Sequence, residues 1–188
     1  MKKSYLKRFA VTVCVAAAIA SCPIAAHAAT DMFLKLGDIK GESLDEKHKD
    51  EIDVLAWSWG ESDGSSPAKR NKGGLAVPDC VQDLALMKSV DSATPDIIMD
   101  AVSGRVVPSA TLTVRKAGGG KASQEYLVLQ LTNVLISSYS TGGSGGEDRL
   151  TESISLHFQR MEGTYRRLKA DGTLDAPIQW VIAGGSCR

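Results

Sequence analysis

Apolar and polar positions alternate with a period of two over most of the chain, which is typical of β-strands. Met32, Leu34 and Leu36 share one face of an expected first strand. A second strand is expected from Glu51 to Gly60. Its two faces carry Ile52, Val54 and Ala56 on one side, and Asp53, Leu55, Trp57 and Trp59 on the other. Because both faces hold large apolar side chains, we expect this strand to be covered on both sides, as in a closed barrel or at a subunit interface.

Further segments alternate in the same way and predict more strands. They are Cys80 to Lys88, Ala110 to Arg115, Glu125 to Ser138 and Ile154 to Phe158. Three glycines, Gly118 to Gly120, separate the second and third of these segments and predict a hairpin turn. A last apolar segment, Ile178 to Ile182, is expected to complete the set of strands.

One helix is expected, from Pro95 to Ser103. Thr94 can cap its first turn, Pro95 suits the first helical position, and Gly104 can end the helix. An apolar stripe on the helix should pack on the sheet, and it consists of Ile97, Ile98, Ala101 and Val102. The pattern therefore predicts a mainly β fold with one helix, and a barrel is the arrangement that best hides edge strands.

The N-terminal segment has the layout of a secretory signal peptide. Basic residues precede an apolar run from Phe9 to Ala20, and the small-residue segment Ala25 to Ala29 follows. We expect cleavage between Ala28 and Ala29, which leaves residues 29–188 as one domain.

Two alternatives to cleavage at this position stay open. Cys22 could be acylated as a lipoprotein anchor, although the usual leucine is absent from that site, or the leader could remain uncleaved. No later segment is apolar for the roughly 20 residues that a membrane helix needs, so we expect no stable membrane insertion once the leader is removed.

Charge and cysteine content narrow the range of partners. The chain has 22 basic and 22 acidic residues, but four of the basic residues and none of the acidic ones lie before Ala28. The remaining domain is mildly acidic, which argues against nucleic acid as its main partner. Cys80 and Cys187 remain after cleavage and can form one disulfide, with two free thiols as the alternative.

Motifs that would indicate catalysis or cofactor binding are incomplete. Gly118 to Lys121 is similar to a phosphate-binding loop, but Ala122 stands where the magnesium ligand Ser or Thr is needed. The glycines of 142–146 lack the spacing of a dinucleotide fingerprint. His48 and His157 lie in no nucleophile motif and, with two distant cysteines, give no metal-ligand spacing. We therefore expect neither enzyme activity nor a cofactor or metal.

Four separated blocks of the sequence together resemble the haemolysin-coregulated protein (Hcp) family. They are Ala29 to Gly41, Glu51 to Gly60, Arg115 to Gly119 and Ser140 to Glu152. The resemblance runs from about Asp31 to about Lys169, and the blocks fall in the order that the family shows. The last block is long and has an unusual composition, which makes the resemblance specific.

This resemblance implies a compact two-sheet β-barrel with a flanking α-helix, six copies of which close into a hexameric ring. In the family, rings stack into a tube that a contractile sheath surrounds and a spike protein tips, and the lumen holds effector proteins. The tube is a secreted, non-catalytic part of the type VI secretion system. A ring requires one face of a subunit to bind a different face of the next.

Candidate interface residues come from the strand Glu51 to Gly60, which has apolar side chains on both faces, and from the glycine-rich block Ser140 to Glu152. They are Leu55, Trp57, Gly142, Gly143, Gly145, Gly146, Glu147, Asp148 and Arg149. The tryptophans have an alternative role, filling the subunit's own core. The loop from Glu61 to Asp79 corresponds to the family's ring-stacking loop and carries Lys69, Arg70 and Lys72, although a solvated loop is the competing interpretation.

The leader departs from the family pattern, because tube subunits normally assemble in the cytoplasm. Either the start site is misassigned or the leader is unprocessed, or the protein is an exported form with another role. The second hypothesis is therefore a periplasmic or secreted Hcp-like binding module that builds no tube. Both hypotheses make the protein secreted, by the type VI system or with periplasmic passage.

Processing at the predicted position gives a mature chain that starts at Ala29, because Ala26 and Ala28 occupy the two small-residue positions of the cleavage site. Intact-mass and N-terminal peptide mass spectrometry of the protein from its native host would measure this. A start at Cys22 with an added lipid mass would instead support the lipoprotein alternative.

Overall fold

The computed structural model describes residues 30–62, 80–116, 124–146, 148–169 and 171–183. The elements in chain order are β1 (Thr30–Leu36), β2 (Ile52–Ser58), β3 (Glu61–Ser62), β4 (Cys80–Val81), β5 (Leu84–Ser89), α2 (Thr94–Ser103), β6 (Val106–Lys116), β7 (Gln124–Gly142), β8 (Thr151–Tyr165) and β9 (Ile178–Ala183). The expected strand segments are confirmed except for Cys80 to Lys88. This segment is two strands, because the chain leaves β4 after Val81 and enters β5 at Leu84, and β4 pairs with β3 beside the main sheet.

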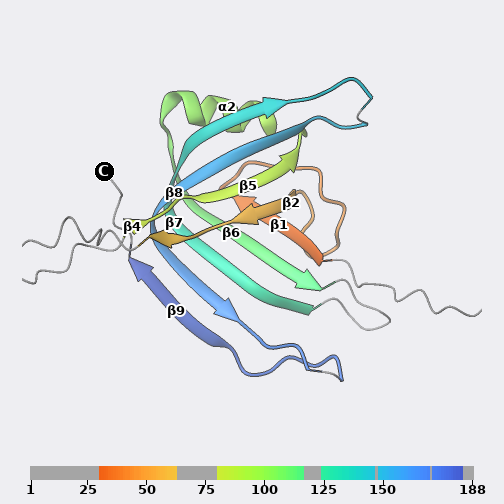
Figure 1. Ribbon diagram of the computed structural model, residues 1–188, viewed down its shortest axis with the longest axis vertical. Coiled ribbons are helices and arrows are strands. Elements are labelled where there is room, and N and C mark those ends of the chain that lie inside the picture. The colour runs from red at the N-terminus through yellow and green to blue at the C-terminus, as the bar shows by residue number, and fades with distance from the viewer. Residues whose placement is uncertain (1–29, 63–79, 117–123, 147, 170, 184–188) are drawn as a thin grey trace, which may run out of the picture.

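The main sheet closes on itself. Its order is β5-β2-β1-β6-β7-β8-β9, and a further pairing between β5 and β8 joins its two sides, so six antiparallel strands form a barrel. Strand β9 lies outside this closure and pairs with β8 alone among the described strands (Figure 1). The barrel with one flanking helix is therefore confirmed. The expectation of two sheets is wrong for the barrel wall, because the β5–β8 pairing joins its six strands into one closed sheet.

In β6, β7 and β8 the alternation of buried and exposed residues is interrupted once, at positions that lie side by side in the sheet. Each has two consecutive exposed residues there, between two buried ones. The buried pairs are Val107 and Ala110, Leu131 and Val134, and Phe158 and Met161. At this level Asn133 has a φ of 52°, a conformation that asparagine tolerates, and its amide donates a hydrogen bond of 2.8 Å to Gln159.

A β-bulge in β2 overturns the expectation of one unbroken alternation there. The register against β5 shifts between Val54 and Ala56, so Leu55 is the extra residue. Beyond the bulge Trp57 pairs with Leu86 and packs against the core, whereas Ala56 turns outward. Cover on both sides is wrong for the single subunit, since Leu55 remains 51% exposed.

Helix α2 extends one residue further than predicted and differs at its N-terminus. The N-cap is Ala93, so the prediction that Thr94 caps the first turn is wrong, because the Thr94 hydroxyl faces the barrel and donates to Glu152. Gly104 ends the helix with a φ of 67°, as predicted. The apolar stripe is only partly correct: Ile97 is buried but Val102 is 81% exposed.

A buried ionic cluster joins the helix to the closing strands of the barrel. Lys88 of β5 and Glu152 of β8, each 1% exposed, are direct partners in the β5–β8 register, and their charged atoms lie 2.6 Å apart. Asp91 accepts a second bond from Lys88 at 2.7 Å, and the hydroxyls of Thr94 and Tyr139 donate to Glu152. Burial raises the pKa of the Tyr139 phenol, and its bond to Glu152 raises it further.

Replacing Lys88 by Met leaves the buried Glu152 carboxylate, and the partly buried Asp91 carboxylate beside it, without a cation, so the free energy of unfolding should fall by about 3–5 kcal/mol. The double variant Lys88→Met, Glu152→Met should recover most of this loss, because it removes the uncompensated charge on the opposite strand. Urea denaturation measures both. Lys35→Met, at an exposed position of β1, is the control that should change little. A full loss that persists in the double variant would contradict this account.

Candidate assembly surfaces

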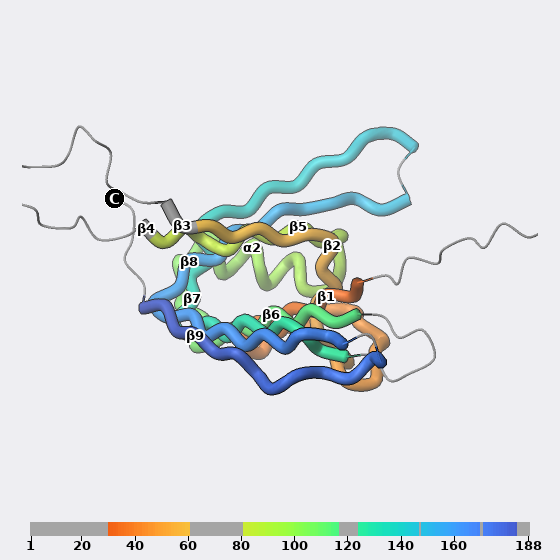
Figure 2. Tube along the Cα trace, turned by 60° about the horizontal axis from the view of Figure 1, so that its bottom comes forward, coloured from red at the N-terminus to blue at the C-terminus, as the bar shows by residue number. Residues whose placement is uncertain are grey.

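The long hairpin of β7 and β8 carries most of the predicted interface residues. Its described tip residues between the strands are all exposed, and the tip projects from one end of the barrel in both views (Figures 1 and 2). Asp148 and Arg149 lie at this tip, and Glu147 lies outside the described residues. An open groove of about 420 Å³ runs along the hairpin, lined by Ser140, Thr141, Gly142, Gly143, Ser144, Thr151 and Ser153.

The four glycines of the hairpin lie in different structural environments. A Cβ on Gly143 would lie 2.2 Å from the Leu150 side chain, so this glycine lets the hairpin's own two arms approach. Gly146 has a φ of 103°, which side chains rarely adopt. Gly142 and Gly145 face open space, with nothing within 4 Å of an added Cβ. These last two leave the backbone accessible to another molecule.

A second exposed surface surrounds the β2 bulge. Leu55 and Ala56 point outward, and the strand partner of Ala56 is Met87, which is 43% exposed. These three side chains make an apolar patch on the barrel wall, although the sequence pattern indicated only Leu55. Trp57, the other candidate from this strand, is half-buried against the subunit's own core.

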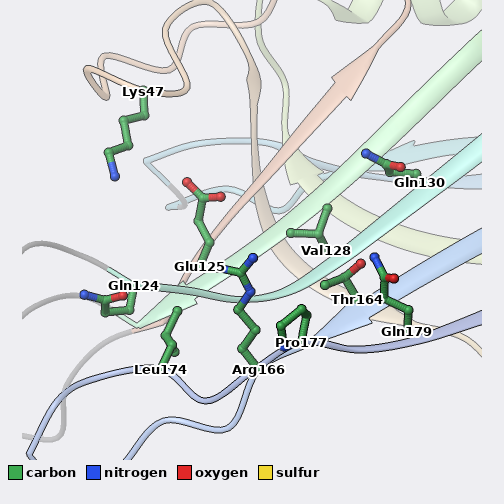
Figure 3. Close-up of a pocket in the computed structure, with 10 residues that line it drawn as sticks. All are labelled: Lys47, Gln124, Glu125, Val128, Gln130, Thr164, Arg166, Leu174, Pro177 and Gln179. Atoms are coloured by element: carbon green, nitrogen blue, oxygen red, sulfur yellow. The ribbon is translucent and has the colours of Figure 1, made fainter.

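A cavity of about 420 Å³ opens on the outer side of β7, β8 and β9 (Figure 3). Its lining residues are Lys47, Gln124, Glu125, Val128, Gln130, Thr164, Arg166, Leu174, Pro177 and Gln179. The Glu125 carboxylate lies between Lys47 and Arg166 in Figure 3. Sequence reasoning missed this site, because its residues come from three strands and two separate loops.

An aromatic and charged cluster fixes the loop that carries Lys47. His48 stacks on Phe33 with ring centroids 4.3 Å apart, and the Arg115 guanidinium lies 4.7 Å from the centre of the same Phe33 ring. The His48 ring also bonds Glu51 at 2.9 Å and faces Glu125 at 3.6 Å. The loop is thereby held on the outer face of β1 and β6.

Asp45 anchors the same loop through Arg115. Its carboxylate accepts a hydrogen bond from the Arg115 guanidinium, which also bonds Asp31 at 3.2 Å. The bond from Arg115 lowers the pKa of Asp45 from 3.8 to about 2, and the backbone N–H groups of Lys47 and His48 add to this effect. The ionised form of Asp45 therefore stabilises the folded chain.

The other histidine makes a contact that does not suit nucleophilic catalysis. His157 bonds Asp83 at 2.9 Å, and the Ser137 hydroxyl donates to the other oxygen of the same carboxylate. In a Ser-His-Asp site the serine must instead bond the histidine, which activates it. The Asp83 carboxylate is thus a bridge between two surface side chains.

Within the described part of the chain, no three His, Cys, Asp or Glu side chains are grouped to hold a metal, and no helix is both long and apolar enough to cross a membrane. Several predicted residues lie outside what the structure describes. They are Ala28, Ala29, Lys69, Arg70, Lys72, Cys187 and the side chain of Cys80.

Comparison with known proteins gives one consistent family. A family model described as "Type VI secretion system effector, Hcp" matches residues 33–165. Protein hcp1 of Pseudomonas aeruginosa is 50% identical over 153 residues, which cover 81% of this chain and 93% of that protein. Hcp1 from Salmonella typhimurium is 31% identical in sequence, with a TM-score of 0.67 and coverage of 82% and 95%. A type VI secretion system effector from Yersinia pestis is 28% identical, with a TM-score of 0.66 and coverage of 82% and 100%.

Replacing Asp45 by Asn should destabilise the protein at neutral pH and progressively less in acid. The lowered pKa means that Asp45 contributes stability above about pH 4, and that this contribution is lost as the pH falls towards about 2. Urea denaturation of wild type and Asp45→Asn at several pH values measures the difference. Asp53→Asn, on the exposed face of β2, is the matched control. A difference that stays constant down to pH 2 would count against the Arg115 bond.

Proposed function

Because the chain belongs to the Hcp family of type VI secretion proteins, we propose that it is a structural subunit of the type VI secretion tube. Six copies form a ring, rings stack into a tube, and the lumen carries effectors. The observation that supports this most is the family match across the whole barrel. Hcp proteins are structural and non-enzymatic, and this chain is accordingly not an enzyme.

The ring interface uses the outward apolar patch of Leu55, Ala56 and Met87 together with the hairpin tip. Burying apolar side chains that water now contacts favours association by about 25 cal/mol for each Å². Three adjacent apolar side chains on a barrel wall are a suitable centre for such an interface, with polar groups around them. The remaining candidate, Trp57, supports the patch from the core side.

Partners beyond the ring follow from the family. A spike protein, a contractile sheath and effector proteins are proposed to bind the assembled tube, and the loop with Lys69, Arg70 and Lys72 is proposed to contact the adjacent ring. The family is one of secreted type VI proteins. We propose secretion through that system for this chain, with no nucleic acid and no membrane span in its function.

The leader supports a second candidate function. An exported chain with the same barrel would act as a periplasmic or secreted binding module that does not build a tube. The basic and apolar N-terminal residues favour this candidate, because they resemble a secretory signal. The mature N-terminus and the oligomeric state distinguish the two functions.

Purified protein that starts at Ala29 should elute as a hexamer in size-exclusion chromatography with light scattering. Leu55→Asp should shift the hexamer towards smaller species, because a carboxylate is then buried in the apolar patch without a partner. Val102→Asp, on the exposed face of α2, is the matched control and should assemble normally. A wild-type protein that stays monomeric at high concentration would support the binding-module function instead.

A further inference from the structure

We propose that the hairpin tip of one copy docks in the cavity beside β9 of the next copy, with Asp148 next to Lys47 and Arg166. This inference rests on the proposed ring and names two complementary faces for its subunit contact. The partner is a second copy of this chain, and each copy contributes the hairpin on one side and the cavity on the other.

Asp148 at the hairpin tip and the two cations of the cavity, Lys47 and Arg166, carry opposite charges. Lys47 and Arg166 are both exposed at the cavity, and among the described residues neither has a carboxylate within ion-pair distance. Glu125, the one carboxylate of the lining, already faces His48 at 3.6 Å. Asp148 is likewise exposed and makes no ion pair with any described residue. Two cations and one carboxylate line the cavity, so one further carboxylate next to Lys47 and Arg166 balances its charge.

The positions of the two faces suit a ring. In both views the hairpin lies on one side of the barrel and β9 lies on the opposite side (Figures 1 and 2). A ring needs this head-to-tail arrangement, in which two different faces of identical subunits meet. The hairpin tip projects past the barrel, so it can reach a neighbour.

The cavity also has the right size and chemistry for a hairpin tip. Its volume of about 420 Å³ is within the range of sites that enclose a small ligand, and would hold one turn of backbone with small side chains. Gln124, Gln130 and Gln179 supply amides that both donate and accept hydrogen bonds. The tip offers exposed backbone at Gly142 and Gly145, where no side chain hinders a close approach.

A charge swap between the two faces tests the proposal. Asp148→Lys and Arg166→Glu should each raise the concentration at which half of the hexamer dissociates, by at least about tenfold, because each places like charges together. The double variant should return this concentration to within about threefold of wild type, because the pair is restored in reverse. Lys47→Glu with Asp148→Lys repeats the test with the second cation. Light scattering over a dilution series at low salt measures the concentration at which half of the hexamer dissociates.

Lys35→Glu is the matched control, since Lys35 is exposed on β1 away from the cavity and should leave the hexamer unchanged. A gain in the double variant that disappears in about 1 M salt would support direct contact, because charges are then screened within about 3 Å. A stable hexamer in which the two reversals are merely additive, or without effect, overturns this contact but leaves the ring intact. A cavity that binds acidic cargo peptides while the reversals spare the hexamer also overturns it. A monomeric wild type overturns both the contact and the proposed ring.

Discussion

The ion pair of Lys88 and Glu152 is the interaction on which the closed fold depends. Transfer of two charges out of water is costly, and only close pairing with further hydrogen bonds offsets that cost. These bonds exist only when β5 lies beside β8 in one register, with Thr94 at the start of α2 directly above. A shift by one residue would leave Lys88 opposite Thr151 or Ser153, neither of which carries a charge. The pair therefore selects one closure of the barrel and one position of the helix.

Closure of six strands leaves few places where the chain can bind another molecule through its backbone. The barrel removes the sheet edges that would otherwise attract other strands, and β9 and the long hairpin are among the described parts that extend beyond it. Strand β9 borders the cavity, and the tip of the hairpin carries Asp148. The anchoring of the loop by Phe33, His48 and Arg115 then fixes where Lys47 stands. The closed barrel and the anchored loop together set the positions of the surfaces available to a partner.

Strand content, the helix and the barrel could be predicted because alternation and helix signals are local properties of the sequence. The bulge at Leu55 could not, since it depends on how β2 meets β5 and no single strand encodes that register. The role of Lys88 could not be predicted either, because its partner Glu152 is far away in the sequence and lies beside it only when the barrel closes. The family resemblance indicated the hairpin as an interface. The cavity had no local signal, since Lys47 and Arg166 are distant in sequence.

The bend shared by β6, β7 and β8 limits how the sequence can vary in length. All three strands exchange inward and outward positions at the same level, next to Asn133. Deletion of one residue within any of them would put that strand out of step with both neighbours on one side of the bend, exposing apolar side chains and burying polar ones. Insertions and deletions among relatives should therefore accumulate between strands, and the spacing from Val107 to Val114 should resist change over evolutionary time.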